Sequence, residues 1–232
     1  MRDTARRVAR AVEAGEATLV LGGDCTVGIG TVAGHVGSEE RVGLIYSDAH
    51  ADLNLRDEIS PGALDWMSMA HMLGEEGAAR ELAEVGPRSP LLAPEQVVLF
   101  AWDPEQATDH ERAAIERLSV DVVPVDEVSA DPSGAARRAL ELLEGRAERL
   151  IVHFDVDVID FTDVPLSENP GRNEGLAYEH ALEALAALAD SRRIVGLTVT
   201  ELNPRPRRGG RRERPATRTG PRPSLHTKLS LA

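Results

Sequence analysis

The strongest constraint on the fold is an apolar run at residues 42–46 that leads directly into a cluster of metal-competent side chains. Asp48, His50 and Asp52 follow this run at every second position. In extended backbone, alternate side chains point the same way, so two or three of these groups can converge on one ion. Carboxylates with an imidazole suit a hard or borderline divalent cation. The segment therefore predicts a buried strand that ends in a metal site rather than in a solvated turn.

A second acidic cluster follows another apolar run, at residues 150–154. Asp155 and Asp157 share one side of the chain, so one of them could bridge two ions while the other binds one ion terminally. Buried carboxylates repel one another strongly, and metal ions are the usual remedy. The two clusters together predict a binuclear site with ions about 3.5–4 Å apart.

The remainder of the chain alternates short apolar runs with helical segments. We expect helices at residues 4–14, 27–35, 66–73, 132–143 and 178–189, another that opens at residues 103–105, and strands at residues 18–21, 42–46, 96–101, 122–125, 150–154 and 194–200. This alternation indicates a parallel sheet covered by helices on both faces. In such sheets the site lies outside the carboxyl ends of the strands, where Asp24, both acidic clusters and Glu201 all fall.

Composition limits the class of protein. The chain has 232 residues, of which 42% are hydrophobic and 28% charged, as expected for one large domain with a substantial core. No apolar stretch approaches the roughly 20 residues that span a bilayer, and the opening residues lack the apolar region of a signal peptide. A single cysteine excludes an internal disulfide. We therefore expect a cytoplasmic protein without a membrane partner.

Charge divides the chain at residue 204. Residues 205–232 hold nine basic residues and one acidic residue, whereas residues 1–204 hold 38 acidic and 17 basic residues. The acidic body, taken as one domain, argues against nucleic-acid binding. The basic segment lacks an apolar period, which predicts a disordered tail. An abrupt shift to Arg, Pro, Gly and Thr is also typical of a GC-rich gene read in a shifted frame.

Four short motifs resemble the signatures of the arginase/agmatinase/formiminoglutamase (ureohydrolase) family. They are residues 22–24 (GGD), 48–52 (DAHAD), 155–157 (DVD) with Asp160, and 201–204 (ELNP). They occur in the family's order and cover about residues 18–204. The resemblance implies a three-layer α/β/α sandwich of the arginase/deacetylase type that holds two Mn²⁺ ions. Beside the family, both ends of the chain look truncated.

The resemblance also implies roles for individual residues. Asp48, Asp52 and Asp155 would serve the first ion, and the second ion would be held by Asp48, His50, Asp155 and Asp157. Glu201 would face a cationic amidine or guanidine group of the substrate. Asp52 would pass a proton to the leaving amine.

Two departures from the family pattern bear on the site. Cys25 stands where the family usually has a histidine ligand of the first ion. A cysteine at a helix N-terminus has a lowered pKa and favours zinc or iron over manganese, although Cys25 could also fill space beside an empty site. Asp65 falls where arginases carry a proton-shuttling histidine, and residues 61–66 lack the Ser and Asn that hold an amino acid's carboxylate. Arginine itself is therefore a doubtful substrate.

Other candidates carry weaker signals. His153 lies two residues before Asp155, on the same side of an extended chain, and could approach the site. A hydrogen-bonded core histidine is the more common arrangement. Asn54 could reach substrate or cap a turn. Glu168, in a loop after the second cluster, is a candidate for specificity.

Three functional hypotheses follow. The first is a binuclear hydrolase that cleaves a linear C–N bond of an amidine or guanidine by metal-activated hydroxide. The second is a catalytically degenerate relative that serves as a binding or oligomer module. The third is a mononuclear zinc deacetylase-like amidohydrolase. The expected partner is a small cationic substrate, and a homo-oligomer remains open.

Overall fold

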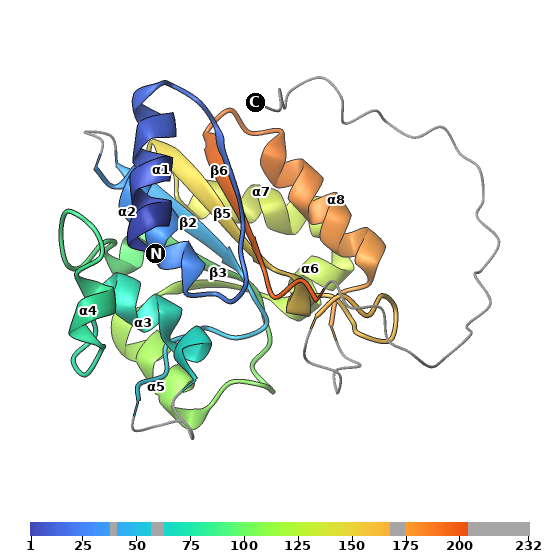
Figure 1. The fold of residues 1–232 in the computed structure, drawn as a ribbon. Helices are drawn as coiled ribbons and strands as arrows, with labels where there is room; N and C mark the ends of the chain where they lie inside the picture. The colour runs from blue at the N-terminus through green and yellow to red at the C-terminus, as the bar shows by residue number, and fades with distance from the viewer. Residues whose placement is uncertain (38–40, 57–62, 168–174, 204–232) are drawn as a thin grey trace.

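A six-stranded parallel sheet forms the centre of the computed structural model, which describes residues 1–37, 41–56, 63–167 and 175–203 (Figure 1). The strand order is β1-β6-β5-β2-β3-β4, and every neighbouring pair is parallel. The strands are β1 (Thr18–Leu21), β2 (Val42–Ser47), β3 (Val97–Trp102), β4 (Asp121–Pro124), β5 (Arg149–Asp155) and β6 (Ile194–Thr200). All six strands agree with the sequence prediction to within one or two residues at each end.

Helices cover both faces of the sheet (Figure 1). One layer holds α1 (Arg2–Glu13), α2 (Val27–His35), α3 (Ser68–Leu73), α4 (Arg80–Ala83) and α5 (Asp109–Leu118). The other holds α6 (Val125–Ala130), α7 (Pro132–Leu142) and α8 (Tyr178–Ala189). Short 3₁₀ turns are η1 (Leu64–Met67), η2 (Pro94–Gln96) and η3 (Val156–Val158). The expected three-layer α/β/α sandwich is confirmed.

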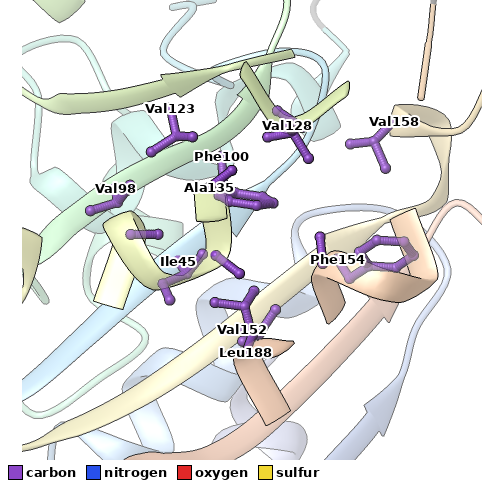
Figure 2. Packing of buried hydrophobic residues seen from close by; sticks show 14 of the residues in the cluster. Ile45, Val98, Phe100, Val123, Val128, Ala135, Val152, Phe154, Val158 and Leu188 are labelled. Carbon is purple, nitrogen blue, oxygen red and sulfur yellow. The ribbon is translucent and has the colours of Figure 1, made fainter. Parts of the chain in front are cut away.

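Each face of the sheet has its own hydrophobic core. Along β2, Leu44 and Tyr46 pack on the α2 side, whereas Ile45 packs on the α7 side, as the alternation of strand side chains requires. Figure 2 shows Ile45 beside Val152 of β5 in the second core. Because all three side chains are almost fully buried, β2 is held firmly on both faces and its carboxyl end is a rigid place for a site.

The main error of the sequence prediction concerns the helix after β3. We expected it to open at residues 103–105, but α5 begins at Asp109. The Asp103 carboxylate instead accepts hydrogen bonds from the backbone of Glu105 and the side chain of Gln106, which closes a turn. Thr108 then caps the helix, since its hydroxyl accepts from the backbone N–H of Glu111 at 3.1 Å. Helix α6 was also missed, because its first residue was assigned to β4.

Strand register brings the two acidic clusters together. Ser47 of β2 is opposite Phe154 of β5, and Asp155 is opposite Thr200 of β6. The residues that follow these strands therefore meet at one edge of the sheet. Within the described ranges, no helix is both long and apolar enough to cross a bilayer. The basic segment 205–232 and Glu168 lie outside the described residues, so the division at residue 204 stays a prediction.

Candidate metal centre

A cavity of about 260 Å³ opens at the carboxyl ends of β2, β5 and β6. Its lining includes every residue to which the sequence analysis gave a role in metal binding or catalysis: Cys25, Asp48, His50, Asp52, Asp65, Asp155, Asp157 and Glu201. Trp66 and Ser167 complete the wall. The fold thus gathers residues from six separate segments of the chain at one place.

A buried cluster that we call the Cys25 group consists of Cys25, Asp48 and Asp155, which line the cavity, together with His153. One potential ligand atom from each of these four buried side chains lies within 4.8 Å of all the others. The Cys25 thiol donates to Asp155 Oδ2 at 2.7 Å and lies 3.6 Å from Asp48 Oδ2. The Thr200 hydroxyl lies against the same carboxylate, 3.3 Å from Asp155 Oδ2.

The second cluster, the His50 group, consists of Asp48, His50 and Asp157. Its potential ligand atoms also lie within 4.8 Å of one another. His50 Nδ1 is 3.3 Å from a carboxylate oxygen of Asp48 and 3.3 Å from one of Asp157. The two groups share Asp48, which therefore lies between two places where a cation can bind.

Asp52 lies in the same cavity but outside both groups. The hydroxyls of Tyr46 and Ser68 both donate to its Oδ2, the second at 2.6 Å. Tyr46 and Ser68 also contact each other at 3.0 Å. These hydrogen bonds fix the orientation of a carboxylate that is 2% exposed. Because both hydroxyls donate to one oxygen, the protein itself fixes the position of the Asp52 carboxylate.

Two residues of the cavity have a left-handed backbone. Asp52 has a φ of 52°, which aspartate adopts more readily than most residues, whereas Glu201 has a φ of 59°, a strained conformation for glutamate. The Glu201 N–H donates to the carbonyl oxygen of Gly23 at 2.7 Å, so the first and last motifs are tied together. Strained backbone of this kind tends to occur at functional sites, where the surrounding structure holds it in place.

Burial without a counter-ion perturbs the acids. Burial and the charge of Asp157 raise the pKa of Asp48, and burial and the charge of Asp48 raise the pKa of Asp52 well above its ordinary range. Burial and the charges of Asp157 and Asp48 do the same to the pKa of Asp155. Each carboxyl therefore holds its proton more tightly than in water, and a nearby cation would remove the cause of the shift.

His50 behaves in the opposite way. Burial opposes its protonation, but the hydrogen bonds and charges of Asp157 and Asp48 outweigh burial and raise its pKa to about 12. The ring is 5.9 Å from that of Trp66 and nearly parallel to it, so Trp66 forms a roof over this side of the cavity. Without metal, a protonated His50 is the cation of the site.

The expected low pKa of Cys25 is wrong for the metal-free protein. Burial raises the pKa of the thiol well above its usual range, and the charges of Asp155, Asp52 and Asp48 raise it further. The position at the start of α2 is too weak to offset three acidic neighbours. Cys25 is therefore a thiol that would lose its proton only when a cation binds beside it.

The sequence analysis overlooked the residues that support the site. His153 belongs to the Cys25 group. The sequence favoured a core histidine at this position, although its spacing of two residues from Asp155 already indicated the same side of the strand. Tyr46, Ser68, Trp66 and Thr200 gave no signal of their own, because each depends on a contact between distant segments.

Comparison with known proteins identifies relatives of this chain. The arginase of Bacillus caldovelox is 32% identical over 203 residues, which are 86% of this chain and 66% of that protein. The arginase of Brevibacillus brevis is 31% identical over 82% of this chain and 63% of that protein. The chain thus spans just under two thirds of the length of these relatives.

Solved structures show the same relationship. The native structure of Bacillus caldovelox arginase superposes with a TM-score of 0.80 at 29% identity, over 88% of this chain and 67% of that one. Formimidoylglutamase from Bacillus subtilis, at 16% identity and a TM-score of 0.71, shares the fold. The sequence model of the arginase family matches residues 1–219, and the chain therefore belongs to the arginase family.

Proposed function

We propose that this protein is a metal-dependent hydrolase that cleaves a linear C–N bond of an amidine or guanidine. The observation that carries the proposal is the pair of buried clusters that share Asp48, each with potential ligand atoms within 4.8 Å of one another. Membership of the arginase family supports it. Two divalent cations, Mn²⁺ in the first instance, would bind here.

The donor chemistry fits such ions. Asp48, Asp155 and Asp157 are at most 6% exposed and lie close together, which is costly unless a cation compensates for their charge. We assign His50, Asp48, Asp155 and Asp157 to one ion, and Cys25, Asp48 and Asp155 to the other. Asp52, which the family resemblance also gives to that ion, lies outside both groups and is left for proton transfer. When bound, such ions lower the pKa of a water molecule and stabilise negative charge on the group under attack.

The protein's own residues would then do the remaining work. Asp52 is oriented by the hydroxyls of Tyr46 and Ser68, so its carboxyl group is held in one position from which it can deliver a proton to a leaving amine. Glu201 lines the cavity in a fixed backbone conformation, so its carboxylate can pair with the cationic nitrogens of the substrate. Trp66 covers His50 and shields that side from water.

The cavity favours substrates with more than one cationic group. Among the described residues, its lining carries six carboxylates and one imidazole but no Lys or Arg. A substrate carboxylate would find no Lys or Arg among these residues to pair with and would be repelled by the half-buried Asp65. We therefore propose a polyamine-like guanidine, and we expect compounds without a carboxylate to show at least about tenfold higher kcat/KM than arginine.

A direct test combines metal analysis with a substrate panel. Purified protein is loaded with Mn²⁺, and urea and ammonia release is measured for guanidines and amidines with and without a carboxylate. Glu201→Gln should lower turnover by about 100-fold or more and leave metal content unchanged. The exposed Glu13→Gln on α1 is the matched control.

The outcomes separate the hypotheses. Absence of bound metal and of hydrolysis would favour a non-catalytic binding module. Turnover of arginine that exceeds that of agmatine-like compounds would contradict the proposed specificity. Wild-type turnover in Glu201→Gln would remove the role assigned to that residue.

A further inference from the structure

His153 is the one member of the Cys25 group without a role in the proposed reaction. Its ring is 1% exposed and stacks on Tyr46 with ring centroids 4.4 Å apart and an interplanar angle of 15°. Gly28 of α2 leaves room for it, because a Cβ at that position would lie 2.6 Å from His153 Nδ1. The ring is therefore held in one orientation from both sides.

The hydrogen bonding of this ring is incomplete. Nε2 lies 3.2 Å from the Thr200 hydroxyl, whereas Nδ1 faces Gly28 and is buried without a hydrogen-bond partner among the described residues. A neutral imidazole carries one N–H and one lone pair. When Nδ1 carries the proton, the lone pair is on Nε2, beside the Thr200 hydroxyl that also lies 3.3 Å from Asp155 Oδ2, and it can serve a cation there.

Other potential ligands lie close to the ring. A ring nitrogen of His153 lies within 4.8 Å of the Cys25 sulfur and of carboxylate oxygens of Asp48 and Asp155. All four side chains are at most 3% exposed, so they exclude bulk water. The set holds one sulfur, one nitrogen and two oxygens. Sulfur and imidazole donors with carboxylates suit zinc, whereas manganese prefers oxygen donors.

We propose that His153 is a metal ligand, and that with Cys25, Asp48 and Asp155 it forms a four-donor site that binds zinc in preference to manganese. This inference rests on the proposed function only in that both require divalent cations at this edge of the sheet. Binding breaks the S–H bond of Cys25; the proton passes to solvent, and the sulfur keeps the electron pair that forms the bond to zinc.

The competing explanation is that His153 only positions Thr200, whose hydroxyl lies 3.3 Å from Asp155 Oδ2. His153→Gln separates the two, because a glutamine amide can still donate to Thr200 but is a poor zinc ligand. His71→Gln is the matched control. His71 is also a buried histidine, bonded to the Met67 carbonyl and the Ala79 N–H, and it lies outside the cluster.

The experiment uses the full chain freed of metal with a chelator. Zinc and manganese are titrated separately and bound ions are counted by elemental analysis. Cobalt(II) then replaces zinc, because its visible absorption reports sulfur ligation and the number of donors. We expect His153→Gln to weaken zinc binding at the Cys25 group by about 100-fold or more and to change the cobalt spectrum. His71→Gln should change neither.

Each result has a defined meaning. An unchanged zinc affinity and cobalt spectrum in His153→Gln would overturn the ligand assignment while the proposed function stands. Equal affinity of the wild-type Cys25 group for zinc and manganese would overturn the preference for zinc. If the wild type binds no divalent ion at all, the proposed function fails as well.

Discussion

The His50 group and the Cys25 group, which form the two halves of the cavity, compensate for the charge of their buried carboxylates in different ways. The His50 group contains its own cation, because His50 lies 3.3 Å from both Asp48 and Asp157 and its pKa is raised to about 12. The Cys25 group contains no cation, so Asp155 and the Cys25 thiol retain their protons instead. A metal ion must therefore displace the proton of an imidazolium in one half and two weakly acidic protons in the other.

This difference suggests that the halves prefer different metals. The His50 group is the more accessible, with 16% of the His50 side chain exposed, and it offers two carboxylates with one imidazole. The Cys25 group is fully buried and includes sulfur. We expect manganese to fill the His50 group first and zinc to favour the Cys25 group.

The largest effect should come from Asp48, which both halves share. Asp48→Asn should remove both ions and lower any hydrolysis by more than about 1,000-fold, because an amide cannot supply the bridging charge. Asp157→Asn should remove only the ion of the His50 group. Elemental analysis of both variants, beside the exposed Asp190→Asn, measures this. Two ions retained by Asp48→Asn would show that the halves are independent.

The second prediction concerns Cys25, whose replacement by histidine would make the donors of the Cys25 group more like those of the His50 group. Cys25→His removes the sulfur and should strengthen manganese binding at the Cys25 group by about tenfold while it weakens zinc binding. Cys25→Ser keeps the size of the side chain and should weaken binding of both metals. Calorimetric titration with each metal provides the comparison. Unchanged affinity for both metals in both variants would mean that Cys25 does not contact an ion.

The third and smallest effect concerns the stability of the metal-free protein. Asp155 has a folded-state pKa above its usual 3.8, so its contribution to stability is lost as pH rises above about 4. His50 loses its contribution only above its usual 6.5, toward 12. His153, with a pKa lowered to about 3, acts oppositely and costs stability as pH falls below 6.5.

Urea unfolding, measured across the pH ranges given above, tests which residue is responsible for each change in stability. Each proton held only by the folded state changes the free energy of unfolding by about 1.4 kcal/mol per pH unit. Asp155→Asn should flatten the fall between about pH 4 and 6.5, whereas His50→Gln should alter only the fall above 6.5. A saturating divalent ion should reverse the slope, since it favours the ionised carboxylates. Identical profiles for the two variants would refute the distinction between the halves.

Much of this architecture was predictable because short-range pattern and strand order determine it. Apolar runs that end in Asp48 and Asp155 indicated both the strands and the edge where they meet. The position of His153 depends instead on the register of β5 against β6, which brings its Nε2 to 3.2 Å from the Thr200 hydroxyl. The start of α5 was missed for a local reason, since the turn closed by Asp103 competes with a helix start.

The left-handed backbone at Glu201 has a consequence for laboratory evolution. Glycine at this position would relax the chain by about 1 kcal/mol or more and delete the carboxylate that the proposed reaction needs. A library selected for heat resistance alone should therefore accumulate glycine at residue 201. Its most durable members would be the least active, so thermal screens of this protein need a parallel screen for turnover.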